Sequence, residues 1–154
     1  MNTILDLQLA CDNPHIPAES ELQACLDTVL GQQKIGQLEL TVRFVTLEES
    51  QQLNKQFRGI DKPTNVLSFP FEAPPGLDFN LLGDLVICAD IVEQEAQQQN
   101  KLILHHYLHM LVHGTLHLMG FDHIEDDEAQ RMEGLEISIL AKLAVDDPYK
   151  DLYR

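Results

Sequence analysis

The segment from His113 to His123 constrains this chain more than any other, because it places three histidines at the spacing H-x3-H-x5-H around a glycine. Residues four apart lie one above the other on a helix, so His113 and His117 project from one face. Gly120 follows where a helix that must stop and reverse favours a left-handed residue, and the returning chain can bring His123 beneath the first two imidazoles. Three imidazole nitrogens at about 2.0–2.1 Å from an ion with one open position are typical of catalytic zinc. We predict one zinc ion per chain, bound by these three histidines.

The neighbouring histidines strengthen this prediction. A single histidine on an apolar helix is usually a packed or solvated residue, but six of the seven histidines here lie between positions 105 and 123. His105 and His109 continue the same row of residues four apart. Each step of four rotates by about 40°, so the row drifts away from the ion. We therefore expect His109 to be packed or to support a ligand, and His105 and His106 to be solvated.

The histidine segment also resembles the metzincin protease motif H-E-x-x-H-x-x-G-x-x-H, which it matches at all three histidines and at the glycine. Those proteases use the glutamate as general base for peptide hydrolysis. This chain has Gly114 at that position. A metallopeptidase is therefore an alternative that the missing base weakens.

The charge of the chain restricts its partners. A net charge of −15 argues against general nucleic-acid binding, because phosphate contacts need lysine and arginine. The charge is uneven, however, since Lys55, Arg58 and Lys62 lie close together while residues 122–136 hold seven acidic side chains and one basic one. A small basic spot near a metal can bind one phosphate group but cannot grip a long duplex, so we expect no DNA partner.

Cysteine usage and hydropathy indicate the compartment. The three cysteines, Cys11, Cys25 and Cys88, form no C-x-x-C pair, which favours a reducing compartment without a disulfide framework. The first residues lack a basic stretch followed by an apolar one, so we expect no secretory signal. The most apolar stretch, residues 102–119, is interrupted by five histidines and does not fit a membrane span.

Apolar periodicity predicts strands and helices in the order β-α-β-α-β-β-α-α-α. The expected strands are 2–10, 38–45, 66–71 and 82–88, and the expected helices are 18–30, 46–57, 90–99, 101–119 and a last one that begins near 125. Gly31 is expected to end the first helix. Pro70 cannot donate to a sheet hydrogen bond, so the third strand is expected at an edge.

Two capping boxes support the helix starts, since Thr46 precedes Glu49 and Asp90 precedes Glu93 by three residues. The element order predicts an α/β fold of the α+β type, with a small mixed sheet of about four strands packed by helices. We expect a single domain over residues 1–154, with the metal site at the end of a central helix.

Three segments of the chain are distinctive beyond their periodicity. They are R-G-x-D-K-P-T-N-V-L-S-F-P-F-E from Arg58 to Glu72, L-L-G-D-L-V-I-C from Leu81 to Cys88, and H-G-T-L-H-L-M-G-F-D-H-I-E-D-D-E from His113 to Glu128. Together they resemble the bacterial YbeY family of rRNA-maturation endoribonucleases. The resemblance implies a zinc-dependent, single-strand-specific endoribonuclease that acts in 16S rRNA 3′-end maturation and ribosome quality control. It also implies a cytoplasmic setting, with ribosomal RNA and the ribosome or ribosomal proteins as partners.

The same resemblance implies roles for individual residues. His113, His117 and His123 would bind the zinc ion, and Arg58 would be the catalytic basic residue that faces the metal. Phe121 departs from the family, which usually has tyrosine after the glycine. If that hydroxyl contacted substrate, its role is unfilled here, although packing of the ring would survive.

The predicted chemistry does not need a glutamate base. Zinc can lower the pKa of bound water to about 7, and Arg58 would stabilise the charge that builds on the phosphoryl oxygens. Asp122 is either a solvated carboxylate or a partner that orients a ligand histidine. Ser68 and Asp84 could shape the site or serve folding. The non-enzymatic alternative is a ribosome-associated binding module with a structural zinc site that Asp122 or His109 closes.

Overall fold

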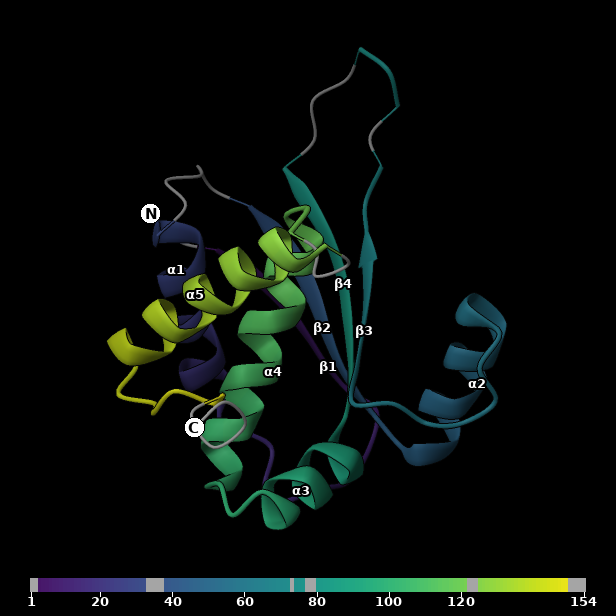
Figure 1. The fold of residues 1–154 in the computed structure, drawn as a ribbon. Coiled ribbons are helices and arrows are strands. Elements are labelled where there is room, and N and C mark those ends of the chain that lie inside the picture. Colours follow the sequence, from purple (N-terminus) through teal and green to yellow (C-terminus); the bar gives the residue numbers. More distant parts are fainter. Residues whose placement is uncertain (1–2, 33–37, 73, 77–79, 122–124, 150–154) are drawn as a thin grey trace.

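The computed structural model describes residues 3–32, 38–72, 74–76, 80–121 and 125–149. Within these residues the strands are β1 (Ile4–Leu9), β2 (Glu39–Val45), β3 (Val66–Pro70) and β4 (Leu81–Cys88), and the helices are α1 (Glu19–Gln32), α2 (Leu47–Arg58), α3 (Ala89–Gln98), α4 (Ile103–Leu118) and α5 (Asp126–Lys142) (Figure 1). This order of strands and helices is the one predicted from the sequence. No helix in the described part of the chain combines the length and the hydropathy that a bilayer crossing requires.

The strands form one mixed sheet in the order β1-β2-β4-β3. The β1–β2 and β2–β4 pairs are parallel and the β3–β4 pair is antiparallel. Parallel neighbours need a crossover, which α1 provides between β1 and β2. The third strand lies at an edge as predicted, and Pro70 is its last and exposed residue.

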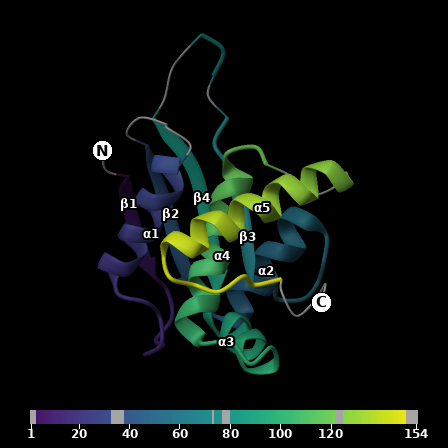
Figure 2. The same cartoon turned by 60° about the vertical axis from the view of Figure 1, so that its left-hand side comes forward.

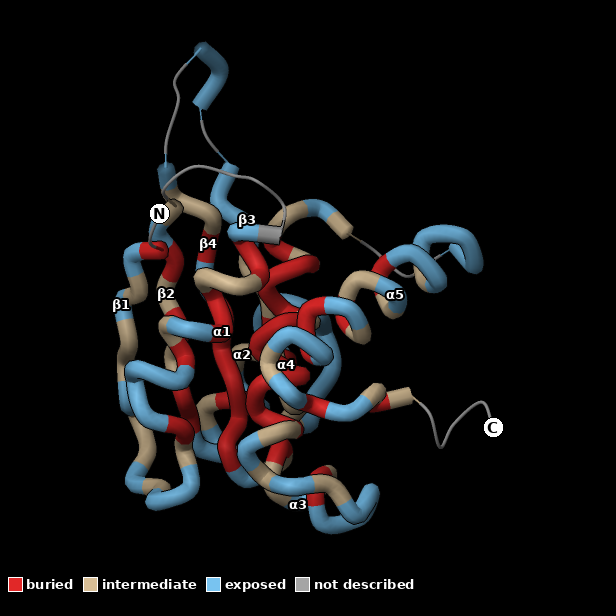
Figure 3. The backbone as a smooth tube through the Cα atoms, turned by 90° about the vertical axis from the view of Figure 1, so that its left-hand side faces the viewer, coloured by how far each residue is buried: buried red, intermediate tan, exposed pale blue. Residues whose placement is uncertain are grey.

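Alternation along β2 divides the core between the two faces of the sheet. Leu40, Val42 and Phe44 are fully buried against the layer formed by α1, α4 and α5, which lie side by side in Figures 1 and 2. Val45 points to the other face, where a smaller cluster includes Leu53 of α2. Figure 3 shows that the buried backbone concentrates in β2, β4 and α4.

Helix α4 is central because apolar residues surround most of it, as expected for a buried helix. Leu111, Val112 and Leu116 are completely buried. Gly114 allows the helix to approach the sheet closely, since a Cβ atom there would stand 2.8 Å from Cδ2 of Leu85. This approach fixes the rotation of α4, and therefore the direction in which its histidines project.

Two details at helix ends differ from the predictions. Helix α1 continues through Gly31 to Gln32, because glycine weakens a helix without excluding it. The first capping box is only half formed. Thr46 Oγ1 accepts from the Glu49 N–H at 3.2 Å, whereas the Glu49 carboxylate accepts from Arg43 Nε at 2.7 Å rather than returning to residue 46.

The second predicted capping box is wrong. Helix α3 begins at Ala89, one residue before Asp90, and its N-cap makes no side-chain hydrogen bond. The Glu93 carboxylate accepts instead from Asn13 Nδ2 at 2.6 Å and from the Tyr107 hydroxyl at 2.7 Å. Tertiary partners thus outcompete the local cap.

Candidate metal centre and cleft

His113 and His117 lie on the last turns of α4, and their imidazoles converge. Their Nε2 atoms are 3.2 Å apart and their ring centroids 4.7 Å apart. Two nitrogens bound at 2.0–2.1 Å to one tetrahedral ion are about 3.3–3.4 Å apart. The pair therefore fits two ligands of a single zinc ion without a change of backbone.

The turn after α4 has the predicted conformation. Gly120 has a left-handed φ of 99°, and the Phe121 N–H donates to the Leu116 carbonyl at 3.1 Å, so the helix closes and the chain turns away. The predicted third ligand, His123, and the neighbouring Asp122 lie outside the described residues.

A cleft of about 700 Å³ opens beside these histidines. It follows the edge strand β3, with His113 and His117 of α4 on one wall and the end of α2 on the other. Phe57 is 57% exposed in this cleft, and its ring meets that of Phe69 edge to face at 5.1 Å. The cleft thus combines nitrogen ligands with exposed aromatic surface.

Arg58 lines the same cleft as the two histidines. It is the exposed last residue of α2, and Gly59 ends that helix in a left-handed conformation with φ 72°. The fold therefore brings the cation predicted to be catalytic to the same cavity as two predicted metal ligands, although the motifs are far apart in the sequence.

Glu136 of α5 supports His113 from the side away from the cleft. Its side chain is 1% exposed and accepts hydrogen bonds from His113 Nδ1 at 2.5 Å and His109 Nε2 at 3.1 Å. The Tyr149 hydroxyl donates to the same carboxylate. An ionised carboxylate only accepts, so His113 carries its proton on Nδ1 and leaves the Nε2 lone pair directed toward His117.

The electrostatics of this group favour that proton arrangement. Burial raises the pKa of Glu136, but hydrogen bonds and charge from His109 and His113 outweigh it and lower the pKa to about 2. Burial lowers the pKa of His109, although Glu136 opposes the shift. An ionised glutamate beside imidazole N–H donors is therefore the stable state near neutral pH.

His109, His113 and Glu136 could also hold a metal themselves, since one ligand atom from each lies within 4.8 Å of the others. The 2.5 Å contact between His113 Nδ1 and Glu136 Oε1 is too short for two ligands of one tetrahedral ion, and it fits a charge-assisted hydrogen bond. His109 and Glu136 are buried, whereas His117 borders the cleft. The geometry favours an ion between His113 and His117, with Glu136 as supporting group.

Sequence reasoning missed the role of Glu136, which was only counted among the seven acidic side chains of residues 122–136. A signal was available in its spacing. It lies four residues after Met132 and three before Ile139, so it falls on the apolar stripe of α5, whose members Met132 and Ile139 are buried. A charged residue on such a stripe needs a buried partner.

The predictions for the other helix histidines have mixed outcomes. His109 is 6% exposed and packed, as predicted, and His105 is partly exposed. The solvated position expected for His106 is wrong. Its side chain is 3% exposed and bonds to Glu95 of α3 at 2.9 Å, because α3 packs against that side of α4.

The sequence left open whether Ser68 and Asp84 shape the site or serve folding, and the structure distinguishes the two residues. Ser68 lines the cleft and its hydroxyl donates to the Gly114 carbonyl at 3.3 Å. Asp84 borders another cavity with Arg43. It alternates with Leu85, which packs toward α4, so Asp84 lies on the opposite face of the sheet from the histidines.

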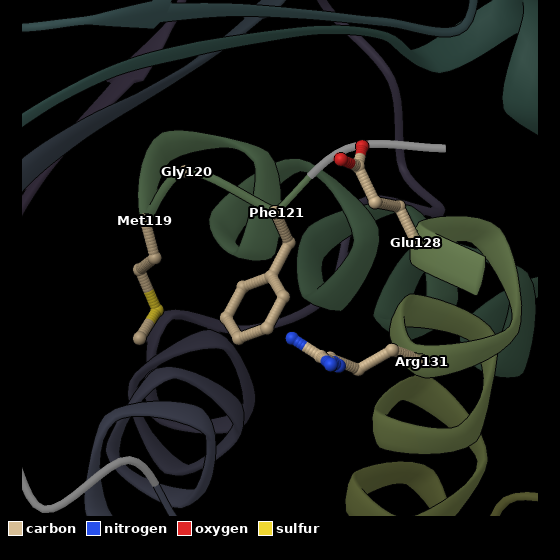
Figure 4. A pocket seen from close by; sticks show the side chains of 5 residues that line it. All are labelled: Met119, Gly120, Phe121, Glu128 and Arg131. Atoms are coloured by element: carbon tan, nitrogen blue, oxygen red, sulfur yellow. The ribbon is translucent and has the colours of Figure 1, made fainter. Parts of the chain in front are cut away.

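A separate pocket of about 410 Å³ lies where α4 ends. Phe121 packs partly buried against the core, so the ring fulfils the packing role expected of it. Figure 4 shows the side chains of Phe121 and Arg131 pointing toward the same space, with Glu128 above them. None of the described lining residues is a histidine.

Comparison with known proteins finds relatives over most of this chain. The family model described as Endoribonuclease YbeY matches residues 9–144. A relative from Colwellia psychrerythraea, also described as Endoribonuclease YbeY, is 53% identical over 152 residues, which cover 97% of this chain and 98% of that protein. The solution structure of a Thermotoga maritima protein is similar with a TM-score of 0.59 and 26% identity, over 92% of each chain.

Proposed function

This chain belongs to the endoribonuclease YbeY family and is an RNA-cleaving hydrolase, and we propose that it cuts single-stranded RNA with one zinc ion held by His113, His117 and His123. We propose further that its substrate is ribosomal RNA at the 3′ end of 16S rRNA, and that it acts in ribosome quality control in the cytoplasm with the ribosome or ribosomal proteins as partners. The observation that carries the proposal is the convergence of two imidazole nitrogens, 3.2 Å apart, with Arg58 in one open cleft.

The metal, Arg58 and Glu136 each have a task in this chemistry. When bound, zinc supplies Lewis-acid chemistry toward a phosphodiester and a source of hydroxide at neutral pH. Arg58 binds the non-bridging phosphate oxygens through its planar fork and stabilises the charge that grows on them. Glu136 holds His113 in the tautomer that directs Nε2 into the cleft.

No side-chain base can stand next to His113 in the position that proteases of similar spacing use. Position 114 faces Leu85 and Val66, from which a Cβ atom would lie only 2.8 and 3.2 Å away. This packing argues against the metallopeptidase alternative. It is compatible with attack on a phosphodiester, where the metal can supply the nucleophile.

The side chains in and near the cleft support a preference for single-stranded RNA. Phe57 offers exposed aromatic surface beside Arg58, and an unpaired base can stack on such a ring while its phosphate reaches the metal. A base within A-form duplex is already stacked and cannot. The exposed acidic first turn of α5, Asp126 to Glu128, also opposes the dense charge of a duplex.

The test is cleavage of one RNA that contains a perfectly paired stem and a single-stranded tail, by zinc-loaded and by metal-stripped protein. We expect cuts in the tail only, and only with metal. Equal cutting of stem and tail would contradict the single-strand preference. Metal-independent binding without any cutting would favour the binding-module alternative, and an absence of stoichiometric zinc would remove the metal assignment.

A further inference from the structure

We propose that Glu136 is a positioning residue for His113 and that Tyr149, in the segment after α5, holds Glu136 in place, so that this segment sets the metal affinity of the site. The proposal rests on the assignment of His113 and His117 as ligands. It adds to that assignment a contribution from a part of the chain that lines no wall of the cleft among the described residues.

The two carboxylate oxygens of Glu136 have different partners. Oε1 accepts from His113 Nδ1 at 2.5 Å. Oε2 lies 3.1 Å from His109 Nε2 and accepts from the Tyr149 hydroxyl. Because Oε2 is engaged by two groups, the carboxylate cannot rotate without breaking both contacts, and Oε1 remains directed at His113.

This arrangement matters for the metal because an imidazole has two nitrogens and two ring orientations. A hydrogen bond from Nδ1 to a fixed carboxylate selects the tautomer whose Nε2 binds metal, and it raises the basicity of that nitrogen. Loss of such a supporting group typically lowers metal affinity by about 10–100-fold. His113 is the one imidazole in the described part of the chain that contacts both Glu136 and His117.

Tyr149 is itself held firmly enough to keep the Glu136 carboxylate in place. The Pro148 carbonyl accepts from Lys101 Nζ at 3.0 Å, and the Tyr149 N–H donates to Asp147 Oδ1 at 2.8 Å. The Tyr149 ring meets His109 edge to face at 5.4 Å, and Pro148 is buried. The segment is thus anchored to Lys101, just before α4, and, through the tyrosine hydroxyl, to Glu136.

The chain offers matched controls on the other side of α4. Tyr107 is a buried tyrosine whose hydroxyl donates to a carboxylate, Glu93, at 2.7 Å. Glu95 accepts from a helix histidine, His106, at 2.9 Å. Tyr107→Phe and Glu95→Gln therefore alter hydrogen bonds that include neither a proposed ligand nor Glu136, although Glu95 also accepts from Asn65 of the cleft.

The experiment measures the zinc dissociation constant of each full-length variant by competition with a chelator, together with its thermal stability. We expect Glu136→Gln to weaken zinc binding by about 10–100-fold, and Tyr149→Phe to weaken it by a smaller factor. Tyr107→Phe and Glu95→Gln should change stability but leave the affinity at the parent value. With cobalt as the probe metal, the visible spectrum should shift in the first two variants and not in the controls.

Two results would overturn the proposal. Parent-like zinc affinity and cobalt spectra in both Glu136→Gln and Tyr149→Phe would disprove the positioning role. In that case, zinc-dependent RNA cleavage by the parent protein would still support the proposed function. Loss of bound zinc in Glu136→Gln with full retention in His117→Ala would show that Glu136 is itself a ligand. If Glu136→Gln does not fold, Tyr149→Phe decides, because it removes a single hydroxyl from a partly exposed residue.

Discussion

Gly114 and Leu85 stand so close that a Cβ atom at position 114 would lie 2.8 Å from the leucine Cδ2. The contact fixes how α4 rests on β4, and it lies next to the first proposed ligand, His113. The glycine that replaces the protease glutamate is thus a packing requirement of this fold. The histidine spacing is shared with another enzyme class, but the helix is set against a sheet where no base can follow the first histidine.

Gly114→Ala should therefore be destabilising even though alanine favours helices. Alanine gains about 1 kcal/mol in helix propensity, but overpacking against the completely buried Leu85 typically costs about 1–3 kcal/mol. Gly134 of α5 is a matched control, because a Cβ atom there has no neighbour within 4 Å, so Gly134→Ala should stabilise by up to about 1 kcal/mol. Urea unfolding of both variants checks this, and an equal gain from both would contradict the packing argument.

His117→Ala should abolish tight zinc binding, because its Nε2 lies 3.2 Å from that of His113 and the remaining ligands cannot close the site. His105→Ala, in the first turn of the same helix and outside the cleft, is the control and should retain one zinc per chain. Metal analysis of the purified variants measures both. One full zinc equivalent in His117→Ala would disprove the ligand assignment.

Arg58→Glu should leave folding and zinc content near normal while cleavage of single-stranded RNA collapses. Loss of one well-placed electrostatic donor costs about 10²–10³ in rate, and reversing the charge should cost more. Arg58→Lys should restore part of the activity, because it keeps the charge without the planar fork.

Arg131→Glu makes the same charge change outside the cleft and should retain most of the cleavage rate. Single-turnover rates of the zinc-loaded proteins distinguish these cases. Parent-like rates in Arg58→Glu would exclude this residue from the mechanism.

Phe57→Ala should weaken RNA binding while zinc binding is preserved, because the exposed ring borders the cleft and base stacking is worth about 1–3 kcal/mol. Leu102→Ala removes an apolar side chain that is 66% exposed and lies outside the cleft. We expect a raised KM or Kd for single-stranded RNA in the first variant and no change in the second. Equal values in both would leave Phe57 without a role in the substrate complex.

Stability should fall as pH rises above about 9, in part because of Cys25. Burial raises the pKa of this thiol from 9.0 to about 12. Between these values the unfolded chain releases a proton that the folded chain retains, so the free energy of unfolding decreases by up to about 1.4 kcal/mol per pH unit. Cys25→Ala should show a shallower decrease in urea unfolding between pH 8 and 10. An unchanged slope of the free energy of unfolding against pH would contradict the assignment of this decrease to Cys25.

Much of this protein follows from local rules. The element order, the edge position of β3 and the turn at Gly120 were predictable because periodicity and glycine conformation act within a few residues. The convergence of His113 and His117 belongs to the same class, since a helix fixes the direction of side chains four residues apart. The failed capping box at Asp90 shows the limit, because Glu93 found partners in Tyr107 and Asn13 instead.

The positions of the residues that assist the proposed ligands, Glu136 and Arg58, were decided by tertiary structure alone. Glu136 is tolerated on the apolar stripe of α5 because His109, His113 and Tyr149 bind it there. A buried carboxylate without such partners would be strongly unfavourable. Arg58 reaches the cleft because α2 ends beside β3. The sequence determined which side chains a helix or turn presents, because those preferences are local. The packing of distant elements decided which of them meet, since each contact depends on partners that no local pattern encodes.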